Sequence, residues 1–139
     1  MKYLLTLLLL ITTIYAEDIA IVKELSGDVS AKTLHSTHQL KLGEHLSEDM
    51  ILITKQNSTL TIIFNDNSTL VLGENSLLNL KKFIFKPMSQ EYEFKLFLQK
   101  GSLSFESGKI GELSPESFEL KVPEGVVAIR GTKFLVIVQ

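Results

Sequence analysis

The sequence predicts a single all-β domain of about 8–10 short strands, and three observations support this prediction. After residue 18, apolar side chains alternate with polar ones nearly everywhere, which is the period of a half-buried strand. The alternating runs end at clusters of Gly, Asn, Asp and Ser, residues that favour turns. No segment after residue 16 keeps a helical apolar stripe for three turns. The sequence leaves open a sandwich-like fold or a short β-solenoid-like stack.

Length and composition exclude several classes of protein. The chain has 139 residues, 45% hydrophobic and 22% charged, which fits one globular domain. Its formal charge is −2 and its basic residues are scattered, so a nucleic-acid partner is not expected. It has no cysteine, which excludes disulfides, thiol catalysis, cysteine-based metal sites and an N-terminal lipoprotein anchor.

Residues 1–16 have the pattern of a secretory signal peptide. Lys2 precedes an apolar run from Leu4 to Ile14, and a small residue, Ala16, ends the segment before two acidic residues. A membrane-spanning helix needs about 20 apolar residues, more than this run supplies. We expect cleavage after Ala16, which leaves a domain at 17–139 in the periplasm. The alternative is an uncleaved membrane anchor.

The first half of this domain is expected to form short strands separated by tight turns. Gly27 is placed in a turn or bulge between two of them. Residues 58–64 form the clearest strand, and Asn65–Ser68 turns the chain into another strand at 70–72. Asn57 and Asn67 match the glycosylation acceptor pattern, but both are interpreted as turn residues.

The second half continues the alternation. Residues 75–82 fit either a short helix or a strand, and 91–98 and 118–122 fit strands. Lys100–Ser102 is expected to turn the chain before a short strand at 103–105. The final strand, 134–138, is apolar on both faces, which is typical of a strand that is covered on both sides.

Near the C-terminal end, the segment from Val122 to Phe134, with its Arg-Gly-Thr-x-Phe box, resembles the signature of FecR domains. Four upstream stretches resemble the same family in the same order, so the resemblance covers about residues 20–138. The residues that carry it, interpreted as mainly structural, are Gly27, Asp28, Gly43, Asp49, Asp66, Gly101, Pro123, Arg130, Gly131, Thr132 and Phe134. Arg130 is expected to hold backbone carbonyls at a turn, the alternative being contact with a partner's carboxylate.

The resemblance implies a binding or signalling module that recognises a protein or a cell-envelope polymer. The best-known members are inner-membrane proteins that sense a siderophore-loaded transporter and control a sigma factor through a cytoplasmic segment. Here the β domain directly follows the expected signal peptide, so an exported periplasmic module is expected instead. The alternative is an inner-membrane-anchored regulator of iron-uptake-type transmembrane signalling.

No enzyme, cofactor or metal site is predicted. His35, His38 and His45 lie in a polar stretch without a supporting carboxylate pattern, so they are interpreted as solvated. The candidate acids adjoin turn residues, where carboxylates usually cap the backbone, and they are Asp28, Asp66, Glu116, Glu119 and Glu124. No nucleophile elbow or phosphate-binding glycine loop is present in the sequence.

The strand 134–138 is also the predicted contact with a partner. Related domains usually continue with at least one more strand, whereas this sequence stops at Gln139, so we expect either a truncated chain or a strand at an exposed edge. If the strand lies at an exposed edge, its apolar residues are a template for pairing with another chain or a second copy.

Overall fold

The computed structural model describes residues 17–128 and 133–139, and it has an all-β fold, as predicted. The described residues form twelve strands, more than expected, because three of the strands have only three residues each. They are β1 (Asp18–Ser26), β2 (Val29–Lys32), β3 (Thr37–Gln39), β4 (His45–Ser47), β5 (Ile51–Thr54), β6 (Thr59–Phe64), β7 (Thr69–Leu72), β8 (Leu77–Lys86), β9 (Glu91–Glu106), β10 (Phe118–Val122), β11 (Gly125–Val127) and β12 (Lys133–Val138).

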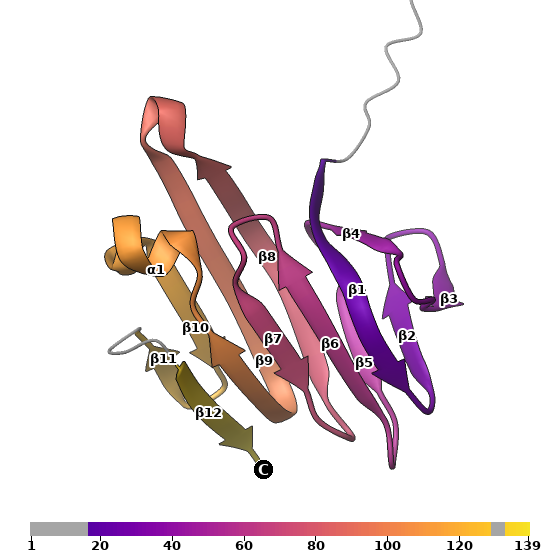
Figure 1. Cartoon of the computed structure of the whole chain (residues 1–139). Coiled ribbons are helices and arrows are strands. Elements are labelled where there is room, and N and C mark those ends of the chain that lie inside the picture. The colour runs from indigo at the N-terminus through magenta and orange to yellow at the C-terminus, as the bar shows by residue number, and fades with distance from the viewer. Residues whose placement is uncertain (1–16, 129–132) are drawn as a thin grey trace, which may run out of the picture.

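All the strands belong to one sheet that curls on itself into a half-barrel (Figure 1). The main path through the sheet is β3-β2-β5-β8-β9-β7-β6-β1-β4. Neighbours are antiparallel except β10, which runs parallel to β9. The long strand β9 belongs to both halves of the curled sheet. Its first part, residues 91–100, pairs with β8 and β10 in one half, and its second part, residues 101–106, pairs with β7 and β12 in the other. The fold therefore depends on how β9 is held.

Aromatic side chains fill the core between the two halves of the sheet. Phe94 of β9 lies at the centre, with its ring 4.6 Å from that of Phe64 on β6 and 4.9 Å from that of Phe83 on β8. The series continues through Phe105 to Phe118 on β10, at a centroid distance of 4.7 Å. Burying one such ring contributes about 1.5–3 kcal/mol. The packed rings fix the separation of the two halves.

Three consecutive strand connections have the same length and the same sequence pattern. The β5–β6, β6–β7 and β7–β8 connections each contain four residues and end in Asn-Ser. Asn57, Asn67 and Asn75 have positive φ angles of 55°, 67° and 52°, a conformation that asparagine adopts more readily than most residues. The serine after each asparagine is buried. We name these pairs, at 57–58, 67–68 and 75–76, the three Asn-Ser corners.

Each corner serine ties its turn to a distant part of the chain. Its hydroxyl donates to an oxygen two residues earlier and accepts a hydrogen bond from a remote backbone N–H. The accepted bonds join Ser58 to Asp28 at 2.8 Å, Ser68 to Gly108 at 2.9 Å, and Ser76 to Ser102 at 3.0 Å. Because a buried N–H without a partner is costly, each hydroxyl satisfies a group that the strand ladder leaves free.

Glycine makes these contacts sterically feasible. Gly27 and Gly101 directly precede two of the bonded amides, and Gly108 supplies the third. A Cβ on any of the three would overlap the corner that it faces. Gly27 and Gly101 also have positive φ angles, of 79° and 98°. Each corner therefore needs a serine on one segment and a glycine on the other.

Gly101 lies inside β9, so the turn predicted at Lys100–Ser102 is wrong. Before it, Lys100 pairs with Leu77 of β8, and after it Leu103 pairs with Leu72 of β7. The strand bends at Gly101 and passes from one half of the sheet to the other without reversing. The local Gly-Ser sequence fits a hairpin turn equally well. It forms a bend within β9 because the N–H of Ser102 bonds the distant Ser76 hydroxyl.

Two other expectations are resolved by the structure. The segment 75–82 enters strand β8 rather than a helix. The interpretation of 134–138 as covered on both faces is wrong, because β12 alternates half-buried and exposed residues. Leu135 and Ile137 are 65% and 66% exposed. Uninterrupted apolar sequence did not distinguish a covered strand from an edge strand that has an apolar outer face.

The helices are short and lie at the ends of strands. The α-helix α1 (Lys109–Leu113) follows β9, and single 3-10 turns η1 (Pro87–Ser89) and η2 (Pro115–Ser117) follow β8 and α1. Among residues 17–128 and 133–139, no helix has the length and apolar character needed to cross a membrane.

The bend in β9 can be tested with Gly101→Ala. We expect this substitution to lower the free energy of unfolding by at least about 2 kcal/mol, since an alanine is strained at positive φ and its Cβ overlaps Ser76. Urea unfolding followed by far-UV circular dichroism measures the change. Gly125→Ala is the control, because a Cβ there meets nothing within 4 Å. Equal stabilities of the two variants would contradict the role of the bend.

Candidate functional site

The structure distributes the family-motif residues over several turns rather than gathering them at one site. Arg130, Gly131 and Thr132 lie outside the described residues. Gly27, Asp28, Asp66 and Gly101 belong to the Asn-Ser corners or their partners. Phe134 packs on Phe105 at a ring distance of 5.4 Å, and Pro123 lies in the β10–β11 turn. Gly43 and Asp49 have positive φ angles in turns on either side of β4.

Asp66 is the one fully buried carboxylate among the described residues. One carboxylate oxygen accepts the backbone N–H of Ser68 at 3.0 Å. The other accepts the Ser68 hydroxyl at 2.8 Å and the N–H of Ile110, in the first turn of α1, at 3.1 Å. The three donors engage both oxygens of this fully buried carboxylate, so it joins a corner to the start of α1 inside the core.

The histidines do not converge on one point. His38 lies in β3, and its Nε2 is 2.6 Å from a carboxylate oxygen of Glu44, a partner that the sequence pattern did not indicate. His45 Nδ1 is 3.6 Å from a carboxylate oxygen of Asp18, and both side chains are exposed. Within the described part of the chain, no three His, Cys, Asp or Glu side chains are grouped to hold a metal ion. The interpretation of all three histidines as simply solvated is therefore wrong for His38.

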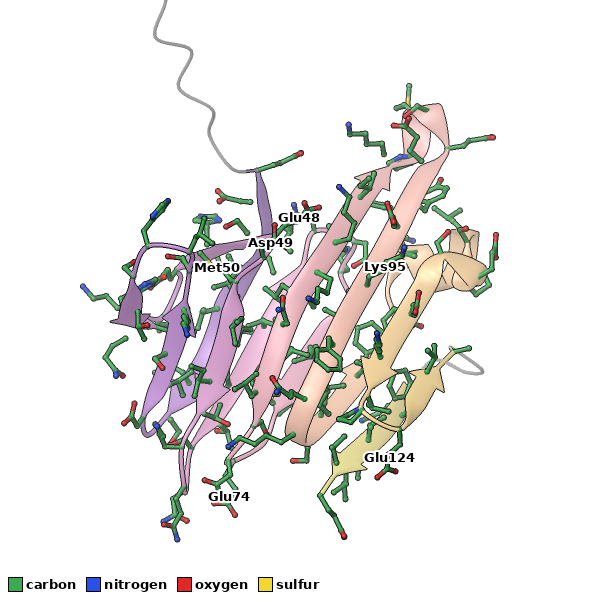
Figure 2. The ribbon with its side chains drawn as sticks, turned by 180° about the vertical axis from the view of Figure 1, so that it is seen from behind. Glu48, Asp49, Met50, Glu74, Lys95 and Glu124 are labelled. Atoms are coloured by element: carbon green, nitrogen blue, oxygen red, sulfur yellow. The ribbon has the colours of Figure 1, made fainter. Side chains whose placement is uncertain are left out.

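A surface groove with a volume of about 390 Å³ runs beside the far half of β8. Residues 82–86 of β8 line one wall, and residues 17–19, at the start of β1, line the other. Asn65 fixes the β1 wall by bonding the backbone oxygens of Asp18 and Ile19. Glu48 and Asp49 also line this groove, and Figure 2 shows them close together near the start of β1.

A second, smaller groove, with a volume of about 330 Å³, lies between the β10–β11 turn and the end of β12. Val122 to Glu124 form one wall, and Val136 to Gln139 form the other. Figure 2 places Glu124 at the end of the molecule opposite Glu48. Among the described residues β12 pairs only with β9, so its outer edge is open. Leu135 and Ile137 extend the apolar surface beside this groove.

Two strand edges lie beside the grooves in the described part of the chain, one on β12 and one on the far half of β8. An extended segment that pairs with a strand edge gains main-chain hydrogen bonds, and neighbouring pockets select its side chains. These two edges are therefore candidate sites for an extended chain.

Sequence reasoning missed the larger groove and the meaning of the corners. The corners had a readable signal: Asn-Ser-Thr-Leu occurs at 57–60 and 67–70, and Asn-Ser-Leu-Leu occurs at 75–78. The larger groove had no such signal, since it depends on where β5 stops pairing with β8. No local sequence pattern indicates where that pairing ends.

Comparison with known proteins identifies a family. A family model described as FecR protein matches residues 50–139, which is more than half of the chain. The match extends from the turn before β5 to Gln139, and it includes all three corners and β12. No curated protein and no solved structure matches the chain.

The role of the buried carboxylate can be tested with Asp66→Ala. We expect the free energy of unfolding to fall by about 3 kcal/mol, because each buried donor left without an acceptor costs about 1–3 kcal/mol. Thermal and urea unfolding measure the loss. Asp28→Ala removes an exposed carboxylate and should change stability by less than about 0.5 kcal/mol. Equal effects would contradict the structural role of Asp66.

Proposed function

Because this chain belongs to the FecR family, we propose that it is an exported, non-enzymatic signalling module that acts by binding a protein partner. The family suggests a signalling or regulatory role in general terms. The periplasmic location rests on the signal-peptide pattern of residues 1–16. The binding role rests on the open edge of β12, described next.

The single observation that supports protein binding is the contrast between β12 and the two strands that end the main path of the sheet, β3 and β4. Those two strands have only three residues each, and Leu40, next to β3, and Leu46, in β4, are buried. The strand β12, which lies off this path, presents six residues with one charge, Lys133, and an apolar outer face. Natural edge strands are usually short, charged or covered.

We therefore propose that an apolar extended segment of the partner pairs with the open edge of β12. Leu135 and Ile137 then gain cross-strand neighbours on the outer face, and Phe134 and Val136 gain them on the core face. The groove beside Pro123 receives side chains from the same segment. Main-chain pairing supplies affinity, and the apolar alternation supplies selectivity.

Export predicts the N-terminal residue of the native protein. In cells that express the full chain, the protein should be released by osmotic shock and begin at Glu17, because signal peptidase cleaves after Ala16. Mass spectrometry of the osmotic-shock and membrane fractions measures both. A membrane-bound form that retains Met1 would contradict the proposal and favour an anchored regulator.

Pairing through β12 predicts a position-specific contact in cells. A photo-crosslinking amino acid in place of Ile137 should yield an adduct with one other protein, and adding Leu135→Lys should reduce it by placing a charge beside the paired strand. The same photo-crosslinker at Ile21, which is exposed on β1, is the matched control. Adducts identified by mass spectrometry as a second copy of this chain, or equal adducts from both positions, would contradict the proposal.

A further inference from the structure

The groove beside β8 marks a second free strand edge, at the end of the molecule away from β12. The β8–β9 hairpin rises beyond the other strands (Figure 1). On the side away from β9, β5 pairs only with residues 77–79 of β8. The N–H of Asp49 and the C=O of Met50 bond the backbone of Leu80 and extend the contact by one residue. Past Leu80, no strand among the described residues covers this side of β8.

On this side of β8, past Leu80, the backbone groups therefore have no strand partner among the described residues. Phe83 directs its N–H away from β9, because that group donates to a carboxylate oxygen of Glu48 at 3.0 Å. In an extended strand the backbone groups of alternate residues point to the same side, so the N–H and C=O of Phe85 face the groove as well. The opposite wall offers no such edge, since Asn65 and β4 already bond the start of β1.

Glu48 occupies the position that a neighbouring strand would take. Its carboxylate accepts the Phe83 N–H as a strand carbonyl would, and Lys82 lies 3.8 Å from its other oxygen. The Glu48 side chain is 31% exposed, so it can rotate into solvent. A side chain that blocks an edge and remains free to move leaves the edge available to a competing strand.

The lining of the groove selects the chemistry of that strand. Four carboxylates line it, from Glu17, Asp18, Glu48 and Asp49, against two ammonium groups from Lys82 and Lys86. Beneath the charges lie Phe83 and Phe85, the latter with its ring 6.2 Å from that of Tyr92. An excess of negative charge over an apolar floor complements a segment in which basic and apolar residues alternate.

From this free edge and its charge we infer that the β8 groove binds an extended basic peptide, which adds as a strand to residues 82–86. This inference goes beyond the proposed function, because it concerns a different edge, a different chemistry and the opposite end of the molecule. It does not require β12 to bind anything.

Three labelled hexapeptides test the selectivity: Lys-Val-Lys-Val-Lys-Val, Glu-Val-Glu-Val-Glu-Val and Thr-Val-Thr-Val-Thr-Val. Fluorescence anisotropy with the full chain should show the basic peptide binding at least about tenfold more tightly than the acidic one. Asp49→Asn removes one negative charge while keeping a residue that tolerates positive φ, and it should weaken binding of the basic peptide several-fold. Asp28→Asn, in the connection between β1 and β2, is the matched control and should leave binding of the basic peptide unchanged.

Two further measurements separate strand pairing from adsorption by charge. N-methylation of one alternate set of amides in the basic peptide should abolish binding, whereas methylation of the other set should not, because only one set faces β8. Glu48→Ala frees the Phe83 N–H and should raise the affinity for the neutral Thr-Val peptide about fivefold, which is the contribution of one net hydrogen bond.

The outcomes are distinct. The inference is supported if the chain binds the basic peptide selectively and if methylation of only one alternate set of its amides abolishes that binding. Equal binding of both methylated peptides would show charge attraction alone and overturn it. No binding of the basic peptide at millimolar concentration, or equal weakening by Asp49→Asn and Asp28→Asn, would also overturn it. Since no variant here touches β12, each of these results leaves the test at Ile137 unaffected.

Discussion

The serine hydroxyl at each Asn-Ser corner is the interaction on which the rest of the fold depends. Short connections between strands leave remote, part-buried backbone N–H groups without a ladder partner, and an N–H removed from water without an acceptor is costly. Ser58, Ser68 and Ser76 supply the missing acceptors. Because the facing glycines permit close approach, the same device fastens the β1–β2 turn, the lead into α1 and the bend in β9. Three strand connections thereby hold the curled sheet together.

The curl determines where recognition can occur. Aromatic and aliphatic side chains fill the space between the halves, and the corners lock the turns along the meander from β5 to β8. Two strand edges remain accessible among the described residues: the outer edge of β12, and the far half of β8 past the end of β5. One edge is apolar and the other lies beneath carboxylates. A module with two unlike edges at opposite ends is suited to joining two partners, which fits a signalling role.

Local sequence predicted what local chemistry determines. Alternation predicted the all-β class, and turn residues predicted the reversals at Gly27 and at Asn65–Ser68. Local sequence failed where a distant residue decides the outcome. The strand bends at Gly101 because the Ser76 hydroxyl accepts the N–H of Ser102, and α1 begins where the Asp66 carboxylate accepts the N–H of Ile110. The free edge of β8 depends on the pairing of a third strand, so no residue type marked it in advance. The repeated Asn-Ser-x-Leu pattern was visible and carried more information than any single turn.

Amide hydrogen exchange on the full chain, resolved by residue, tests the central role of the corners most directly. If the serine hydroxyls hold the curl, the amides of Asp28, Ser102 and Gly108 should exchange only through global unfolding, as slowly as core amides in β6 and β9, although two of the three lie outside strands. Exchange of these amides at the rate of ordinary exposed turns would contradict the account. The curl would then depend on packing of the apolar core alone.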